Sequence, residues 1–358
     1  FQRVGRLMNI LVLTSIYPEP DDEINIGVTP VVKYFCEEWV RQGHNVLVIH
    51  NSNYYPKVLY FLPDKIIKKI NSALGIVVPR LEQSQELITK NNGITCYRLP
   101  MLKIIPRHIS SKKQIEDQFK KIEIVLSRES FVPDVIIGHW KNPQIQLLGK
   151  MKEEWGTRTS LVFHALVYVN QKKYLNYLKG IIDTLDVIGA RSEAIANQVK
   201  SMLSLKSDPF ICYSGIADDY FKAEESLLAL INKKTQNSYL FVGRLIKRKN
   251  VKSIMLALEE VYVDEDFVFN VIGDGGEKET LLSIADLLKC KDSIHFKGHK
   301  KRDEVIQSMR ETEVFIMISD NETFGLVYIE AMSQGCIVIA SKNGGMDGII
   351  ENGVNGFL

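Results

Sequence analysis

The chain has 358 residues, of which 45% are hydrophobic and 25% are charged, and its formal net charge is +2 at pH 7. This length predicts two or three domains with the composition of an ordinary globular protein. No run approaches the roughly 20 apolar residues of a membrane-spanning helix, so we expect no integral membrane domain here. The near balance of charge also argues against a simple nucleic-acid-binding protein.

The small net charge conceals a difference between the two halves of the chain. Residues 1–205 hold 27 Lys and Arg against 19 Asp and Glu, a net charge of +8. Residues 206–358 hold 18 against 24, a net charge of −6. The two halves are therefore electrostatically different, which is a first indication of separate domains.

The cysteines and the first residues bear on the cellular location. Five cysteines are scattered with no CxxC pair: Cys36, Cys96, Cys212, Cys290 and Cys336. This pattern is typical of a reduced, intracellular protein rather than a disulfide framework or a zinc site. The seven residues before Met8 are too few and too polar for a secretory signal, so we expect Met8 to be the natural start.

The first predicted elements form a βαβ unit. Residues 9–14 are an apolar run, apolar residues recur at helical spacing over 28–42, and Gly43 separates that helix from a second apolar run at 46–49. The remaining predicted strands, separated mostly by helical patterns, are 94–99, 135–138, 161–164, 187–190, 210–213, 239–242, 268–272, 294–297, 314–318 and 337–340. Such an alternation indicates parallel sheets covered by helices.

This alternation restarts after about residue 220 and so predicts an α/β fold with two doubly wound, Rossmann-like domains. We place the domains at residues 8–205 and 206–358, with the boundary between 205 and 220. A cleft between two such domains would bring the carboxyl ends of both sets of strands together, where ligands bind.

A segment at residues 54–80 interrupts the alternation. It interleaves aromatic and aliphatic side chains with five basic residues and a single acid, Asp64. Such a segment suits an anionic membrane surface, where each Lys or Arg contributes about 1 kcal/mol. It equally suits a lid or a peripheral helix that packs on its own domain.

The densest candidate site lies at residues 320–332, which follow a predicted strand and open a helix at about Phe324. Gly325 allows close backbone approach, and the N–H groups of a helix terminus favour phosphate. Glu322 and Glu330 stand eight residues apart, and two carboxylates there would repel a bare phosphate. They suit hydroxyl groups on either side of a phosphate, as in a nucleotide sugar.

Compensating cations stand in the loop after the predicted strand 239–242. Gly243 and Arg244 come first, and Lys249 and Asn250 follow. A planar guanidinium and a point charge together suit a diphosphate. A lone Arg, Lys or Glu is most often solvated surface; a site is favoured because both motifs follow strand ends within one predicted domain.

With these motifs in this order, the sequence resembles the retaining glycosyltransferases of family 4 (glycosyl transferases group 1), whose GT-B fold has two Rossmann-like domains facing across a cleft. The resemblance covers nearly the whole chain. Its specific motifs are Gly243–Asn250, Gly273–Gly276, Glu322–Met332 and Gly344–Gly345, and its weaker ones are the Gly27 loop, Gly43–His44, Pro133–His139 and His164.

The resemblance implies a role for each matching residue. Arg244 and Lys249 would hold the donor diphosphate and stabilise it as a leaving group, which is the electrostatic contribution that usually dominates. Glu322 would bind the transferred sugar, Glu330 the ribose hydroxyls, and His164 would reach the sugar from the other domain. Further donor contacts are implied for Gly27, Gly243, Gly273, Asp274, Gly275, Phe324, Gly325 and Leu326. His164 would otherwise be a buried core histidine, and for His139 the two interpretations are balanced.

The sequence departs from the family pattern in three places. Ser214-Gly215 stands where an Asn-Gly pair is usual, and Met346-Asp347-Gly348 leaves the base contacts open. Family members also continue through further helices after the point that corresponds to Leu358, so the resemblance implies that those helices are missing here. No D-x-D metal motif stands in the expected context, and we expect cationic side chains in place of a metal ion, with no cofactor.

The resulting hypothesis is a retaining, metal-independent transfer of a hexose or N-acetylhexosamine from a UDP- or GDP-sugar to a glycan or lipid-linked acceptor. The expected context is surface polysaccharide or lipopolysaccharide assembly in the cytoplasm, with peripheral membrane attachment. The alternatives are a GT-B sugar-nucleotide epimerase, a phosphorylase and, less favoured, a non-catalytic sugar-binding protein. A nicotinamide dehydrogenase is disfavoured because the strand 9–14 leads into a loop rich in Pro and Asp rather than a glycine fingerprint.

Overall fold

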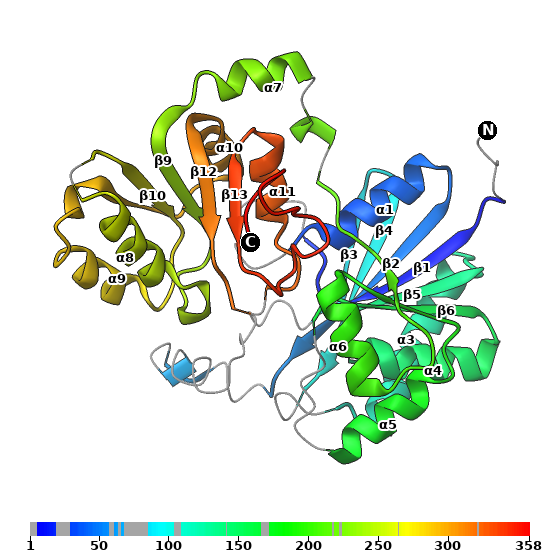
Figure 1. The fold of residues 1–358 in the computed structure, drawn as a ribbon. Helices are drawn as coiled ribbons and strands as arrows, with labels where there is room; N and C mark the ends of the chain where they lie inside the picture. Colours follow the sequence, from blue (N-terminus) through cyan, green and yellow to red (C-terminus); the bar gives the residue numbers. More distant parts are fainter. Residues whose placement is uncertain are drawn as a thin grey trace. The chain divides into compact units, whose positions relative to one another are not determined.

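The computed structural model describes residues 6–18, 29–56, 61–63, 66–67, 85–103, 109–140, 142–165, 172–216, 218–221, 224–263, 265–320 and 322–358. They form two compact units, each with a sheet of its own (Figure 1). The first unit ends at Cys212, and the second holds Tyr213–Leu358 together with Arg191–Ile195. Each unit is described in turn.

The sheet of the first unit has eight strands in the order β3-β4-β2-β1-β5-β6-β7-β8. The strands are β1 (Asn9–Thr14), β2 (Asn45–Tyr54), β3 (Leu87–Asn91), β4 (Ile94–Leu102), β5 (Val135–His139), β6 (Arg158–Phe163), β7 (Val187–Ala190) and β8 (Phe210–Ile211). All neighbours in it are parallel except β3 and β4. The βαβ prediction is confirmed, since β1 and β2 pair in parallel along their whole shared length.

The edge strand β3 is absent from the sequence prediction. It pairs antiparallel with β4, and all but one of its residues are exposed. Asn92 and Gly93 connect the two strands with φ of 49° and 76°. Two successive left-handed residues of this kind form the tight turn that matches the twist of a hairpin. The Asn-Gly pair was therefore a sequence signal for β3, even though the strand itself carries no buried face.

In the described residues, five helices connect strands of the first sheet: α1 (Val31–Arg41), α3 (Lys112–Arg128), α4 (Gln144–Trp155), α5 (Lys172–Ile182) and α6 (Glu193–Leu203). The helix α1 buries Val32 and Cys36 against Val12 of β1 and Val48 of β2. Ser111 caps α3, because its hydroxyl accepts a hydrogen bond from the N–H of Gln114 at 3.3 Å. These contacts fix the helices on the sheet and leave the carboxyl ends of the strands for the loops.

The sheet of the second unit has five parallel strands in the order β11-β10-β9-β12-β13. The strands are β9 (Thr235–Val242), β10 (Val268–Ile272), β11 (Ile294–Gly298), β12 (Thr312–Met317) and β13 (Ile337–Ala340). The helices are α7 (Glu224–Ile231), α8 (Val251–Val261), α9 (Lys278–Ala285), α10 (Arg302–Glu311) and α11 (Leu326–Ser333), with short 3₁₀ turns η4 (Asp218–Tyr220), η5 (Lys247–Lys249) and η6 (Lys291–Ser293). Every strand predicted in this half is confirmed.

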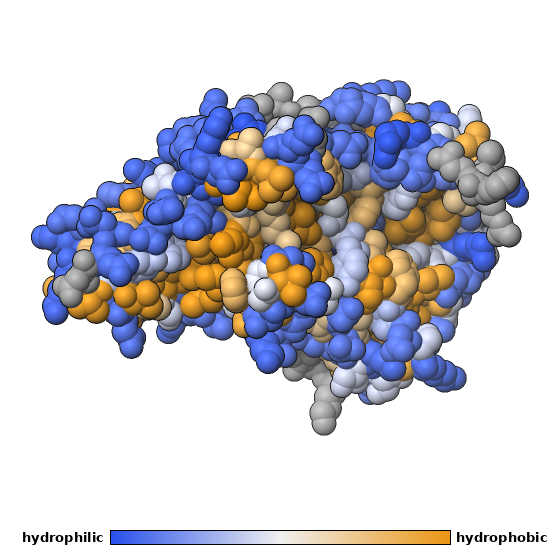
Figure 2. All heavy atoms as spheres, turned by 45° about the horizontal axis from the view of Figure 1, so that its top comes forward, coloured by the Kyte–Doolittle hydropathy of each residue, from blue (hydrophilic) through white to orange (hydrophobic). Residues whose placement is uncertain are grey.

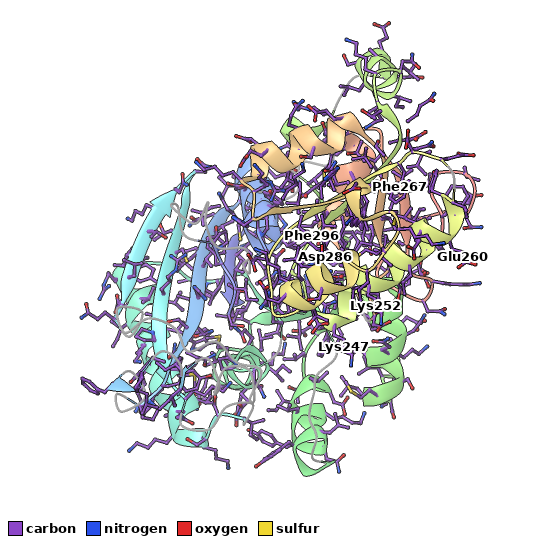
Figure 3. All side chains as sticks on the ribbon, turned by 90° about the vertical axis from the view of Figure 1, so that its left-hand side faces the viewer. Lys247, Lys252, Glu260, Phe267, Asp286 and Phe296 are labelled. Carbon is purple, nitrogen blue, oxygen red and sulfur yellow. The ribbon has the colours of Figure 1, made fainter. Side chains whose placement is uncertain are left out.

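The core of the second unit lies between this sheet and its helices. Phe269 and Phe315 of the sheet are fully buried, and α8 contributes Ile254 and Met255 to the same core. The opposite face of α8 carries exposed polar residues such as Lys252 and Glu260 (Figure 3). This alternation at helical spacing is what the apolar pattern of the sequence predicts.

The last residues of the chain lie along the edge strand β13. The N–H of Phe357 donates to the carbonyl of Val338 at 2.8 Å, and the N–H of Ala340 donates to the carbonyl of Phe357 at 2.9 Å.

Hydrophilic side chains cover much of the molecular surface shown in Figure 2, with hydrophobic side chains exposed among them. Among the described residues no helix is long and apolar enough to cross a membrane.

Both units are Rossmann-like, with parallel strands alternating with helices, and the predicted α/β class is confirmed. The predicted cleft between them stays a prediction. Cys36, Cys96 and Cys336 are buried, as small hydrophobic side chains often are.

Candidate donor site

The residues predicted to bind a donor gather where the order of the second sheet reverses. The chain leaves β9 for β10 on one side, while β12 pairs with β9 on the other. Ligands of open α/β sheets bind at such a switch point, beyond the carboxyl ends of the strands. The loop after β9 carries Arg244 and Lys249, and the loop after β12 carries Glu322.

Backbone and side-chain hydrogen bonds hold these two loops together. The N–H of Asp320 donates to the carbonyl of Arg248 at 2.8 Å. The amide of Asn250 donates to the carbonyl of Ile318 at 3.1 Å. The motifs that stand about 75 residues apart in the sequence therefore form one structural unit, as the strand-end argument predicts.

Lys249 and Glu322 form a buried ion pair at the centre of this arrangement. The ammonium Nζ lies 2.5 Å from Oε2 of Glu322 and 3.2 Å from Sδ of Met317. The side chains of Lys249 and Glu322 are only 10% and 12% exposed, whereas Arg248, at 3.5 Å from the same carboxylate, is 45% exposed. An ammonium and a carboxylate are thus fixed next to each other beyond the carboxyl ends of β9 and β12.

The environment sets the protonation of this pair. Burial by itself would raise the pKa of the Glu322 carboxyl, but the charge and hydrogen bond of Lys249, aided by Arg248, outweigh it and lower that pKa. Burial lowers the pKa of the Lys249 ammonium, and the neighbouring Glu322 opposes that change. The carboxylate is therefore an ionised hydrogen-bond acceptor at neutral pH.

Glu330 is the second predicted carboxylate and has a cation of its own. It lies on α11 with a side chain that is 9% exposed, and its carboxylate accepts a hydrogen bond from Arg302 at the start of α10. The Arg302 guanidinium also lies over the ring of Tyr220, 5.1 Å from its centroid. Burial raises the pKa of Glu330, and Arg302 opposes the increase.

Sequence reasoning missed Arg302 and Tyr220. Arg302 follows β11 by only a few residues, so it stands beyond the carboxyl end of a parallel strand of the same sheet. The rule that selected Arg244 and Lys249 would also have selected Arg302. Tyr220, in η4, carries no such signal in the sequence.

The start of α11 presents backbone rather than side chains. Gly325 is its N-cap with φ of 80°, and Leu326 is the first helical residue. Phe324 is buried, and an added Cβ on Gly345 would lie 2.4 Å from the Phe324 Cα, so the two backbones nearly touch. The predicted backbone contacts of Phe324, Gly325 and Leu326 to a donor stay a prediction, and this geometry allows them.

The glycines after β9 and β10 let two loops pack backbone against backbone. A Cβ on Gly273 would lie 1.9 Å from the carbonyl oxygen of Gly243, and one on Gly275 would lie 2.3 Å from that of Leu245. The N–H of Leu245 donates to the carbonyl of Asp274 at 2.9 Å. These residues hold the loop that carries Arg244 in place, and their predicted donor contacts stay predictions.

Arg244 and Asp274 differ in their surroundings. Arg244 is exposed, and its guanidinium has no hydrogen bond or ion pair with any residue that the structure describes. Asp274 accepts a hydrogen bond from the N–H of Gly275 at 2.7 Å and pairs with Lys278 at 3.1 Å. Lys278 and that backbone bond lower the pKa of Asp274. Arg244 therefore remains available to an anionic ligand, while Asp274 stabilises its own loop.

The predicted histidines lie in the first unit. His164 directly follows β6, and its Nε2 lies 3.0 Å from Nδ1 of His139, the last residue of β5. Both are buried, and the ring of Trp140 stacks on His164 with centroids 4.6 Å apart. The strand-end position is as predicted, and contact of His164 with a sugar stays a prediction. Gly27 lies outside the described residues.

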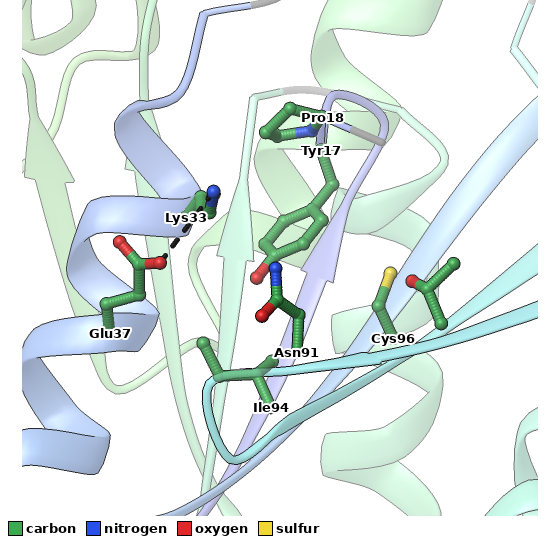
Figure 4. A pocket seen from close by; sticks show the side chains of 8 residues that line it. Tyr17, Pro18, Lys33, Glu37, Asn91, Ile94 and Cys96 are labelled. Atoms are coloured by element: carbon green, nitrogen blue, oxygen red, sulfur yellow. Dashed lines mark ion pairs between the residues drawn. The ribbon is translucent and has the colours of Figure 1, made fainter. Parts of the chain in front are cut away.

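A small pocket in the first unit is too tight for a substrate. It lies beside α1 and the β3–β4 hairpin, around the ring of Tyr17, and its volume is about 20 Å³ (Figure 4). Lys33 and Glu37 form an ion pair of 3.8 Å at its rim. A volume of this size holds about one water molecule.

Two further predictions concern metal and membrane. No three His, Cys, Asp or Glu side chains come together as a metal site would require in the described part of the chain. Most of the basic and aromatic segment at 54–80 lies outside the described residues, so membrane attachment through it stays a prediction.

The comparison with known families agrees with the motifs of the second unit. Residues 224–358 match the family model described as glycosyl transferases group 1. The match covers most of the second unit, and we call these residues the group 1 region. Arg244, Lys249, Glu322 and Glu330 all lie within it.

Two curated proteins are similar in sequence to part of this chain. N-acetyl-alpha-D-glucosaminyl L-malate synthase of Bacillus anthracis is 25% identical over 246 residues, which cover 66% of this chain and 64% of that protein. Alpha-monoglucosyldiacylglycerol synthase of Streptococcus pneumoniae is 28% identical over 202 residues, which cover 54% of this chain and 45% of that protein. Both matches span less than two thirds of the relative's own length.

The solved structure of Anabaena Alr3699/HepE in complex with UDP and glucose superposes with a TM-score of 0.61 at 17% sequence identity. The superposition covers 98% of this chain and 85% of that one. The fold is accordingly GT-B, as the resemblance of the sequence to family 4 implies.

Proposed function

We propose that the protein is a glycosyltransferase that moves a hexose or N-acetylhexosamine from a UDP- or GDP-linked donor to a glycan or lipid-linked acceptor. The observation that carries this proposal is the buried Lys249–Glu322 pair at the switch point of the group 1 region. It places a hydrogen-bond acceptor for sugar hydroxyls directly beside a cation. That combination matches a sugar joined to a diphosphate.

Bond cleavage in such a donor leaves positive charge on the sugar and adds negative charge to the diphosphate. The guanidinium of Arg244 is exposed and has no hydrogen bond or ion pair among the described residues, so it can bind two phosphate oxygens at once. The N-terminus of α11 adds backbone N–H groups. Glu322, ionised beside Lys249, accepts hydroxyl groups of the sugar. Leaving-group stabilisation by groups fixed in advance is the main catalytic contribution in this proposal.

The proposal includes a retaining outcome and independence from metal ions, since Arg244, Arg248 and Lys249 supply the positive charge near the phosphates. One relative is named for a monoglucosyldiacylglycerol, which supports a lipid acceptor, and the solved neighbour holds UDP and glucose, which supports a UDP-linked donor. Turnover should be the same for protein treated with EDTA as for untreated protein. A loss of turnover that Mg²⁺ or Mn²⁺ restores would contradict metal independence.

A panel of nucleotides and nucleotide sugars tests the donor. A ligand at about 100 times its Kd stabilises the folded protein by roughly 2.7 kcal/mol, which is a clear shift in melting temperature. If UDP, GDP and their sugars all leave the melting temperature unchanged, the donor site is wrongly assigned. Nucleotide release only in the presence of an acceptor distinguishes transfer from epimerisation.

Glu330→Gln tests the ribose contact. We expect roughly tenfold weaker UDP binding, because a charge-assisted hydrogen bond to a ribose hydroxyl contributes about 1.5 kcal/mol or more. Stability should change little, since burial already raises the pKa of Glu330 and glutamine removes the buried charge. Titration calorimetry measures the affinity. Glu279→Gln, the same change at an exposed position of α9, is the matched control, and equal affinities in both variants would refute the ribose role.

A further inference from the structure

A large cavity in the first unit is lined by none of the residues predicted to bind the donor. Its volume is about 1180 Å³, and it lies beyond the carboxyl ends of β2 and β4, at the start of α3 and beside α5. Binding sites for small ligands typically have volumes of this order. Strand ends and a helix start also form the part of an α/β unit where ligands bind.

Positive charge dominates the lining of this cavity, which we call the lysine cavity. Four lysines line it: Lys103, Lys112, Lys113 and Lys121. Asp117 is the acidic residue among its described lining residues. The nearby Glu116 does not compensate, because Lys150 holds it at 3.3 Å. A concave surface with one sign of charge concentrates counter-ions.

Two of these lysines are free to engage a ligand. Lys112 and Lys113 are exposed, and neither ammonium group has a hydrogen bond or ion pair with any described residue. Lys121 instead donates to the carbonyl of Pro100 at 2.8 Å. The free pair also occupies the first turn of α3, where backbone N–H groups have no partner within the helix. Ammonium groups and helix N–H groups therefore come together at one place.

The neighbouring contacts make this helix start rigid. The N–H of Ser111 donates to Oε1 of Gln114 at 2.9 Å, which completes a capping box with the Ser111 hydroxyl. One turn later, the buried Gln118 donates to Oδ1 of Asn51 at 2.9 Å. The lysines thus project from a fixed backbone and not from a loop, which reduces the entropy lost on binding.

The rest of the lining suits the body of a larger molecule. Tyr54, Tyr174 and Tyr177 contribute aromatic rings, and Met101 and Leu102 contribute aliphatic surface. Tyr177 is 41% exposed although it is a large side chain. Aromatic rings of this kind offer an apolar face for a sugar ring or a hydrocarbon chain, together with a hydroxyl at the tip.

We propose that the lysine cavity binds a phosphate group of the acceptor, with the lysines and the start of α3 on the phosphate and the tyrosines on the attached sugar or hydrocarbon. The identification of this ligand as the acceptor rests on the proposed glycosyl transfer, whereas binding of the phosphate does not. Two sources share this chemistry: a soluble phosphorylated molecule and a phospholipid headgroup.

The experiment uses the whole chain and two probes. The first probe is sn-glycerol 3-phosphate, measured by titration calorimetry. The second is vesicles of phosphatidylcholine with phosphatidylglycerol in equal amounts, compared with phosphatidylcholine alone by co-sedimentation. The test variant is Lys112→Gln/Lys113→Gln. The control is Lys90→Gln/Lys120→Gln, which removes the same charge from exposed residues of the same unit that do not line the cavity.

We expect the test variant to bind a probe roughly thirtyfold more weakly than wild type and the control to bind normally, since each lysine near an anionic group contributes several-fold to the affinity at moderate salt. Binding of glycerol phosphate identifies a soluble acceptor, and binding of vesicles alone identifies a lipid headgroup. Failure of wild type to bind either probe, or equal weakening in both variants, would overturn the proposal.

UDP binding, measured in the same preparations, separates this inference from the donor assignment. We expect both double variants to bind UDP as wild type does, because neither pair of lysines lies in the group 1 region. If phosphate binding depends on Lys112 and Lys113 while wild type fails to bind UDP, the cavity is an anion site and the proposed donor function is wrong.

Discussion

Lys249→Met should lower the catalytic rate by roughly 10²–10³-fold and the free energy of unfolding of the second unit by about 3–5 kcal/mol. Both effects have one cause: methionine fills the space of the lysine but leaves Glu322 buried without its ammonium partner, which lies 2.5 Å away in the native protein. The carboxylate then loses its ionised state or its position. Urea unfolding followed by far-UV circular dichroism measures the stability, and nucleotide release measures the rate.

The pH dependence distinguishes loss of the ion pair from general damage. In the native protein the pKa of Glu322 is lowered, so its contribution to stability is complete at neutral pH and is lost as the pH falls through the folded-state value. In Lys249→Met burial is opposed only by the weaker effects of Arg248 and Ser319, so the pKa of Glu322 is higher than in wild type and acidification relieves the variant. We therefore expect the stability difference from wild type to shrink as the pH falls. A difference that stays constant with pH would contradict the ion-pair explanation.

Lys252→Met is the matched control for this experiment. Lys252 is exposed on the outer face of α8, three residues from Lys249 (Figure 3). The same chemical change there should alter stability by no more than about 0.5 kcal/mol. Its rate should equal that of wild type.

Gly273→Ala should destabilise the second unit by about 3–5 kcal/mol, from overpacking and backbone strain together. The new Cβ would lie 1.9 Å from the carbonyl oxygen of Gly243, and the residue has φ of +141°, which side chains rarely adopt. The loops after β9 and β10 would have to separate, and with them the backbone that carries Arg244. Nucleotide binding should therefore fall together with stability.

Gly276→Ala is the control in the same loop, because a Cβ at that position meets nothing within 4 Å. All three tryptophans, Trp39, Trp140 and Trp155, belong to the first unit, so their fluorescence follows that unit, while circular dichroism follows both. We expect Gly273→Ala to lower the stability measured by circular dichroism but not that measured by tryptophan fluorescence. Gly276→Ala should change neither by much. Equal stability of the two alanine variants would show that the loops have room that this geometry denies.

Much of the fold could be predicted because its strands are buried on both faces. Strands such as β10 and β12 read as nearly continuous apolar runs, and helical periodicity separates them. The strand β3 escaped prediction because it is an exposed edge whose only signal is the turn at Asn92–Gly93. The strand β8 has just two residues, because it pairs only with Gly189 and Ala190 of β7.

The site was predictable to the extent that strand ends determine it. That rule brought Lys249 and Glu322 to one place, and the structure places their charged groups in direct contact. It could not tell which cation belongs to which carboxylate, because pairing depends on side-chain reach across loops. The partner of Glu330 is Arg302 from α10, a residue that no motif marked. Packing between backbones likewise explains Gly273 and Gly275 in a way that a motif alone does not.

The segment around Phe357 has a consequence for how the protein behaves among other proteins. An edge strand of a sheet offers a row of unpaired backbone groups, to which a strand of another molecule can add. At β13 the carbonyl of Val338 and the N–H of Ala340 are already bonded to Phe357. Strand addition is therefore opposed at Val338 and Ala340 by the segment around Phe357, which already occupies these two backbone groups.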